Sequence, residues 1–400
     1  MQAHPPPQPD RLIFLDWLRI LAFVLLVFYH VGMYYVSWDW HIKSPSPWLA
    51  LENVMRLTGP WRMDLLFLVS GAATAVMLTR FGATPGWLVS RAKRLGLPLL
   101  LGMAIIVPPQ SWLEVRDKLG YSGSFSDFMS LYLSGYGDFC FSPGRCLMLP
   151  TWNHLWFLPY LLVYTVLLWL ALRAWPGLLG RAGQALAARL DGIGIVLWPV
   201  LGLATARTLL QLRFPDTRAM IDDWSGHTHY AAMFVAGAVA ARTPRVWPRL
   251  AQLRWPALVL ALLAWALMVA LRQPGLAPPD LLPRPVWVLL CCTQQWCAIV
   301  AVLGLGFRHL NRDTPWRHYL TQAVFPLYVL HQTTIMLLAK AMLPLQWTPG
   351  PESVVLVVGT LSISVALFEC ARRVRWLAPW FGIKVAAARV VRQHLGDISW

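Results

Sequence analysis

The chain has 400 residues, of which 57% are hydrophobic and only 13% are charged, and its mean hydropathy is +0.52. Soluble domains carry about 25% charged residues, so this composition excludes a soluble enzyme with a single anchor and favours a polytopic membrane protein. The net charge of +16 would indicate a nucleic-acid partner for a soluble chain. Cytoplasmic loops of membrane proteins are basic, however, and we expect no nucleic-acid partner.

Apolar runs predict an all-α bundle of about ten transmembrane helices. The runs cover residues 12–37, 60–79, 95–110, 153–172, 193–212, 227–241, 255–271, 286–307, 319–343 and 353–371. We divide the chain into a short tail (1–11), a membrane domain (12–371) and a basic tail (372–400) that is expected to lie on the inner leaflet. No small-residue cleavage site follows the first run, which is expected to remain as a signal anchor.

Lys and Arg residues decide the expected orientation. If the N-terminus is cytoplasmic, most Lys and Arg residues between the runs lie on the cytoplasmic side, and the opposite orientation inverts this distribution. The positive-inside rule therefore predicts that both termini are cytoplasmic and that the long segment 111–152 lies outside. We expect a multi-pass protein of the bacterial inner membrane; the oligomeric state stays open.

The first apolar run carries three ionisable residues, Asp16, Arg19 and His30. Charged groups at membrane depth are costly, so such residues indicate a functional site. Arg19 and His30 are separated by about three helical turns, which places them on one face about 16 Å apart along the axis. Asp16 lies one turn before Arg19, so either the two form a structural pair or Arg19 lines a cavity open to the cytoplasm.

Two arginines open the third run on the cytoplasmic side. Arg91 and Arg94 in RAKRLGLPLL share one helix face, and we expect them at a helix N-terminus. Free N–H groups and two guanidinium groups there would bind an anion. The alternative is that they anchor the helix to anionic lipid.

Polar and aromatic residues gather at the expected outer ends of the runs. Tryptophan faces and polar edges suit a sugar, whereas the ordinary alternative is the aromatic belt of a membrane protein. The candidate acceptor-binding residues are Tyr34, Trp40, His41, Arg62, Asp64, Asn153, His154 and Trp156. His331, Tyr328 and Glu369 lie deeper and are candidates for support of the site or for a structural network.

The cysteines indicate no metal site. Cys140 and Cys146 share the segment 111–152, where an oxidising periplasm permits a disulfide but does not require one. No Cys–His spacing resembles a zinc site, and we expect no metal or prosthetic group. Four further cysteines lie in apolar runs and are expected to be buried: Cys291, Cys292, Cys297 and Cys370.

Five motifs together resemble the acyltransferase 3 family, and in particular its glucans biosynthesis protein C branch. They are Arg19-x10-His30, RMDLLFLVSG at 62–71, RAKR at 91–94, HLWFL at 154–158 and LYVLH at 327–331. The resemblance implies a ten-helix bundle that transfers an acyl group, succinyl or acetyl, from cytoplasmic acyl-CoA to a hydroxyl of an extracytoplasmic glycan such as a periplasmic glucan. It also implies that His30 is catalytic and that Arg91 and Arg94 serve the donor.

The residues and the resemblance together predict an O-acyltransferase. Acyl-CoA would dock on the basic inner face, with Arg19 guiding it inward, and His30 would act as general base or as an acyl carrier. The rival interpretation is a proton-coupled transporter or glycan flippase, although the chain shows no internal symmetry of the kind common in transporters. A structural or sensory partner in an envelope assembly is a third interpretation.

Overall fold

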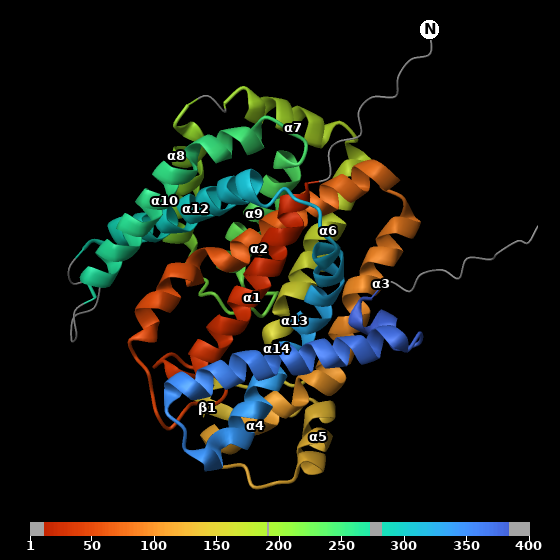
Figure 1. Ribbon diagram of the computed structural model, residues 1–400, viewed down its shortest axis with the longest axis vertical. Helices are drawn as coiled ribbons and strands as arrows, with labels where there is room; N and C mark the ends of the chain where they lie inside the picture. The colour runs from red at the N-terminus through yellow and green to blue at the C-terminus, as the bar shows by residue number, and fades with distance from the viewer. Residues whose placement is uncertain (1–11, 190–191, 273–281, 384–400) are drawn as a thin grey trace, which may run out of the picture.

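The computed structural model describes residues 12–189, 192–272 and 282–383. Within these ranges the chain is helical apart from loops and one two-stranded hairpin (Figure 1). The elements are α1 (Ile13–Tyr35), α2 (Leu51–Phe81), α3 (Pro85–Leu101), α4 (Pro108–Leu119), α5 (Phe125–Ser134), β1 (Cys140–Ser142), β2 (Arg145–Cys146), α6 (Phe157–Ala174), α7 (Leu178–Ala187), α8 (Gly194–Leu210), α9 (Trp224–Ala240), α10 (Val246–Ala270), α12 (Arg284–His309), α13 (Pro315–Met342) and α14 (Pro349–Arg373).

The predicted class, an all-α polytopic membrane protein, is confirmed. Seven helices in the described ranges are long and apolar enough to cross a membrane, and a bent pair of helices gives an eighth candidate. α8 is apolar but shorter, and α9 has 17 residues. The tail 1–11 and most of the tail 372–400 lie outside the described residues. Phe381, in the first part of the tail 372–400, packs in the core beside Leu330. The described residues of this tail therefore join the bundle.

α1 lies in the interior of the bundle, where it contacts α2, α12, α13 and α14 (Figure 1). α2 packs closely on α9 because each helix presents a glycine to the backbone of the other. A Cβ at Gly71 would collide with the carbonyl of Phe234, and a Cβ at Gly237 would collide with the carbonyl of Leu68. Small residues at such crossings let membrane helices approach closely.

The run predicted at 95–110 is not one straight helix. α3 passes through a π-helical turn (Gly102–Ile106) into α4, with a bend of 40°. The irregular turn and Pro108 leave carbonyl groups without helical partners. The hydroxyl of Tyr132 donates to the carbonyl of Met103 at 2.8 Å, and the hydroxyl of Thr333 donates to that of Ile106 at 2.6 Å. The first bond ties the irregular turn to α5, and the second ties it to α13.

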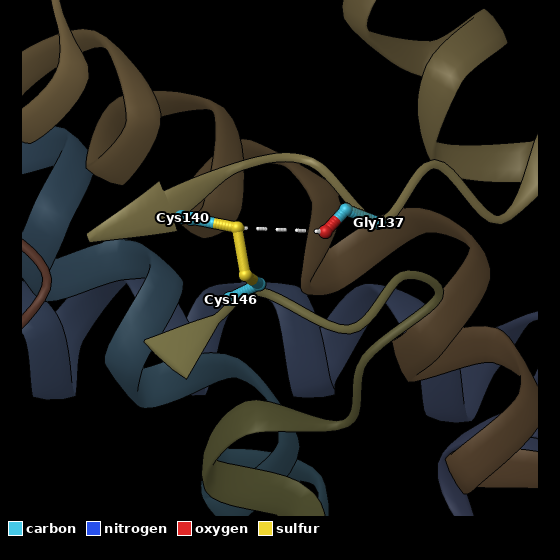
Figure 2. Close-up of a disulfide and its surroundings, with 3 residues drawn as sticks. All are labelled: Gly137, Cys140 and Cys146. Atoms are coloured by element: carbon cyan, nitrogen blue, oxygen red, sulfur yellow. Dashed lines mark hydrogen bonds between the residues drawn. A yellow bond between two sulfur atoms is a disulfide. The ribbon is translucent and has the colours of Figure 1, made fainter. Parts of the chain in front are cut away.

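Segment 111–152 is mostly structured, because it holds the rest of α4, α5 and the β1–β2 hairpin. These elements gather at one end of the molecule, and α7 lies at the opposite end (Figure 1). Cys140 and Cys146 form a disulfide that closes the hairpin, with the Cys140 sulfur 3.9 Å from the carbonyl of Gly137 (Figure 2). Cys370 is exposed, and the expectation that it is buried is wrong.

Candidate active site

Two histidines from helices distant in sequence meet inside the bundle. His30 of α1 and His331 of α13 are 301 positions apart, yet Nδ1 of His30 lies 2.9 Å from Nε2 of His331. Nδ1 of His331 lies 2.7 Å from the backbone carbonyl of Tyr328, one turn earlier in α13. His331 is fully buried, whereas His30 is only partly buried. The sequence marked both residues but gave no sign that they pair.

The contacts of His331 fix the tautomers of the two neutral rings. A carbonyl oxygen only accepts, so the Nδ1–H of His331 donates to Tyr328 and Nε2 of His331 is an acceptor. His30 must therefore donate its Nδ1–H to His331, which leaves the lone pair of His30 on Nε2. Among the described residues this nitrogen has no hydrogen-bond partner. An imidazole held in this way is suited to accept a proton.

His154 lies beside this pair, but both of its ring nitrogens are occupied by the protein. Its Nε2 lies 3.0 Å from the carbonyl of Val329, to which it donates, and its Nδ1 accepts from the amide of Gln110 at 3.2 Å. The Tyr328 hydroxyl donates to the His154 carbonyl at 2.6 Å. The ring centroids of His154 and His331 are 5.1 Å apart. His154 therefore holds α13 in place next to His331.

Gln110 is a buried residue that our sequence reasoning missed. Its amide nitrogen also donates to the hydroxyl of Thr333 at 2.6 Å. Its carbonyl oxygen accepts from Gln332 at 2.9 Å and from Asn153 at 3.2 Å. The sequence signal that could have identified it is a glutamine in an apolar stretch, around PPQSW. A glutamine amide that is buried there needs several polar partners.

Arg62 and Asp64 lie on α2 but have different environments. The carboxylate of Asp64 accepts from His229 at 2.8 Å and from Gln295 at 2.7 Å, and it is buried. The guanidinium carbon of Arg62 lies 3.7 Å from the centre of the Tyr29 ring. Asp64 thus belongs to a buried polar network with α9 and α12, whereas Arg62 faces the α1 residue next to His30.

Most of the aromatic candidates are core residues. Trp156 is 7% exposed and packs with Tyr160 and Tyr230. Trp40 is 7% exposed and Tyr34 is 1% exposed. The guanidinium of Arg218, in the loop between α8 and α9, lies 5.7 Å from the Trp156 ring. These buried indoles offer little surface for a sugar in this conformation.

His41 belongs to an ionic network that joins the loop after α1 to α4 and to the β1–β2 hairpin. Its Nδ1 lies 2.5 Å from Glu114 of α4, which also pairs with Lys118 at 2.9 Å. Asp39 pairs with Lys118 at 2.7 Å and with Arg145 of the hairpin at 2.6 Å. Burial opposes ionisation of Asp39, but the bond to Lys118 and the charges of Lys118 and Arg145 hold the pKa of its carboxyl below the usual range.

Three arginines come together at the other end of α1. Arg19, Arg91 and Arg94 act on one another electrostatically, and Nε of Arg91 is buried without a hydrogen-bond partner among the described residues. The expected helix N-terminus at this place is wrong. α3 begins at Pro85, where the Thr84 side chain caps it, so Arg91 and Arg94 lie inside the helix. A cluster of cations can still bind phosphate groups, but without free backbone N–H groups.

Asp16 and Glu369 have partners that the sequence did not indicate. Asp16 pairs with Arg317 of α13 at 2.6 Å, and Arg317 is fully buried. Glu369 accepts from Tyr319 at 2.9 Å and pairs with Arg372 at 2.7 Å. Asp16 thus joins α1 to the first turn of α13, and Glu369 joins α14 to α13.

Comparison with known protein families identifies the family of the chain. A family model described as an acyltransferase domain, acyltransferase 3, matches residues 12–369. The chain belongs to this family. Its long apolar helices agree with a membrane protein of this family. The resemblance drawn from the five motifs is confirmed.

The chain is also similar to curated proteins named Glucans biosynthesis protein C. Three of them come from Escherichia coli strains SMS-3-5, O1:K1 and O139:H28, and each is 30% identical over 164 residues. The match covers 40% of this chain and 39% of each relative, so it spans well under half of their length. No solved structure matches the chain.

Proposed function

We propose that this acyltransferase moves a short acyl group, succinyl or acetyl, from cytoplasmic acyl-CoA to a hydroxyl of an extracytoplasmic glycan. The observation that best supports this proposal is the hydrogen bond between His30 and His331, which leaves Nε2 of His30 as a proton acceptor. A periplasmic glucan is the proposed acceptor, because relatives with partial similarity are named for glucan biosynthesis. The proposed setting is the bacterial inner membrane, with ten spans and both termini in the cytoplasm.

The arginine cluster supports the proposed position of the donor. Acyl-CoA carries phosphates that cannot enter lipid, so it must bind at the cytoplasmic surface. Arg91 and Arg94 would hold its phosphates, and Arg19 on the same helix as His30 would guide the acyl arm inward. The donor is a substrate in this scheme, and no metal or prosthetic group is required.

The proposed chemistry is direct acyl transfer. Nε2 of His30 takes the proton of a sugar hydroxyl as its oxygen forms a bond to the thioester carbonyl carbon. The carbon–sulfur bond then breaks, and the imidazolium returns its proton to the CoA thiolate, so an ester and free CoA result. In the alternative route Nε2 of His30 attacks the thioester first and carries the acyl group to the hydroxyl.

Release of CoA from acyl-CoA in the presence of glucan tests the proposal. Purified protein in detergent or vesicles should produce free thiol and esterified glucan, measured by a thiol reagent and mass spectrometry. His30→Ala should insert normally, because loss of an imidazole lowers the cost of insertion. It should reduce transfer by roughly 10²–10⁴-fold. A wild-type protein that moves glucan or protons but leaves acyl-CoA intact would instead be a flippase or transporter.

A further inference from the structure

We infer that a cavity between α2, α10 and α12 binds the phosphate group of an anionic phospholipid, with part of an acyl chain in the apolar depth of the cavity. The inference adds a lipid site to the protein, and it depends neither on the acyl donor nor on the acceptor of the proposed reaction. It rests on the shape of the cavity and on two arginines that line it, Arg56 and Arg272.

The cavity lies where α2 is irregular beside α10 and α12. Its volume is about 210 Å³, and Gly59 and Pro60 of α2 line it. Gly59 contributes no side chain to fill this space, and Pro60 has no N–H for the carbonyl of Arg56 one turn earlier. The amide of Gln294 in α12 donates to that carbonyl instead, at 2.9 Å. The indole N–H of Trp265 in α10 donates to a carbonyl in the first turn of α2 at 2.8 Å, so all three helices are fixed around the cavity.

Arg56 and Arg272 line the cavity and have unused hydrogen-bond donors. The Nε of each is buried and has no hydrogen-bond partner in the described ranges. The guanidinium carbon of Arg56 lies 4.8 Å from the centre of the Trp38 ring. That of Arg272 lies 4.8 Å from the centre of the Trp287 ring. An indole attracts a cation but has no oxygen to accept its N–H groups, so an oxygen-rich anion in the cavity would satisfy both guanidinium groups.

The charges around the cavity favour one bound anion. The positive charges of Arg56 and Arg272 act on each other, and Glu52 is the acid that acts on Arg272. Glu52 pairs with Arg56 at 3.0 Å and accepts from the Ser37 hydroxyl at 2.5 Å. No acid forms an ion pair with Arg272 in the part of the chain that the structure describes. Two guanidinium groups and one carboxylate leave one positive charge, which a phosphodiester would neutralise.

The cavity is cationic at one end and apolar below it, which matches the two parts of a phospholipid. Arg56 lies in the second turn of α2, and Arg272 lies just past the end of α10. Pro60 and Met268 line the cavity one helical turn further along these helices, away from the ends that carry the arginines. α10 is the least buried of the seven long apolar helices, since only 22% of its most apolar stretch is buried. Its exposed apolar surface can hold the remainder of a chain, and basic pockets between membrane helices bind anionic head groups.

Two other occupants fit the lining less well. A sugar needs partners for its hydroxyls, but the side-chain N–H groups of Trp265 and Gln294 are already bonded to carbonyls of α2. A free phosphate would reach the arginines but would leave the apolar part of the cavity unfilled. The cavity also contacts Tyr29, the residue before His30, so a bound lipid would pack against α1 beside the candidate base.

Photo-crosslinking tests the inference. The probe is a phosphatidylglycerol with a diazirine in its acyl chain, added to the purified full-length protein in neutral detergent, and mass spectrometry identifies the labelled peptides. Wild-type protein should be labelled in α10 around Met268 and in α2 around Pro60. Unlabelled phosphatidylglycerol should compete with the probe. Phosphatidylcholine should compete about tenfold less well, because the arginines repel its ammonium group.

Two variants act on different parts of the site. Arg272→Gln should lower labelling at the cavity about tenfold, because it removes a charge-assisted contact. Arg116→Gln is the matched control, since Arg116 also lies 4.8 Å from a tryptophan ring, that of Trp112, but does not line the cavity. Gly59→Leu should abolish labelling there while both arginines remain. A Cβ at Gly59 meets only Tyr29, at 3.7 Å, so the new side chain can enter the cavity without a clash.

The competition data decide the inference even if a variant does not fold, and thermal unfolding in detergent monitors the folding of each variant. Equal competition by phosphatidylcholine would show that the arginines do not select an anionic lipid. Competition by glycerol phosphate would assign the cavity to a soluble phosphate, and competition by a neutral oligosaccharide would assign it to the acceptor. Each of these results, or unchanged labelling of folded Arg272→Gln, overturns the inference.

Discussion

Nδ1 of His30 donates to Nε2 of His331 across 2.9 Å, and this bond defines which nitrogen of His30 can work as a base. The carbonyl of Tyr328 holds the other nitrogen of His331, so the pair forms a short chain from α13 to α1. In many enzymes a second group holds the general base in one tautomer by a hydrogen bond, and His331 acts on His30 in the same way. His331 is therefore a positioning residue, and His30 is the residue proposed to touch substrate.

His331→Phe should lower kcat by roughly 10²-fold while the KM for acyl-CoA changes little, because the ring of His30 would lose the acceptor that fixes its tautomer. His331→Gln should restore part of the rate, since its amide oxygen can accept the same bond. Steady-state kinetics of both variants checks the prediction. Equal kinetics for wild type and His331→Phe would show that the bond has no role in the reaction.

His154→Ala should act mainly on stability. The change leaves the carbonyl of Val329 and an amide hydrogen of Gln110 without partners inside the bundle, which costs about 1–3 kcal/mol per group. Thermal unfolding in detergent measures the loss. His154→Ala should keep far more activity than His30→Ala at a temperature where both are folded. If His154→Ala is stable but inactive while His30→Ala transfers normally, the assignment of the base is wrong.

Arg91→Ala and Arg94→Ala should weaken acyl-CoA binding, with about 1.5–3 kcal/mol lost for each charge-assisted contact. Calorimetry on the purified double variant measures the affinity. Lys93→Ala is the matched control, because Lys93 lies between the two arginines but is exposed. Donor affinity that is unchanged in the double variant would assign both arginines to lipid anchoring.

The predicted topology can be measured with reporter fusions. Fusions after residues 45, 85, 130 and 248 should report outside, inside, outside and inside, because the Lys and Arg distribution places the termini in the cytoplasm. Position 130 is the most informative, since it lies in α5 near the end of the molecule that holds the hairpin. A cytoplasmic signal at 130 would put the proposed acceptor on the wrong side.

The stability contributed by Asp39 should depend on pH. Its folded-state pKa is below the usual value of about 3.9. The contribution is therefore complete above that value and is lost as the pH falls through the folded-state pKa. Melting temperatures of wild type and Asp39→Asn should differ at neutral pH and converge in acid. A constant difference down to pH 2 would show that the pairs with Lys118 and Arg145 contribute nothing.

The sequence by itself determined the class of the fold and much of the inventory of the site. Apolar runs marked the helices because only a helix satisfies its own backbone within lipid. Helical periodicity placed Arg19 and His30 on one face of α1, and the five motifs identified the family. These signals are local, since each depends on residues close together in the chain.

Only the tertiary structure decided which side chains meet. The pairing of His30 with His331, the contacts of Gln110 and the pair Asp16–Arg317 join helices far apart in sequence. Periodicity shows which face of a helix is polar, but it does not show which helix packs against that face. The start of α3 at Pro85, before its apolar run, was likewise fixed by the Thr84 cap and not by hydropathy.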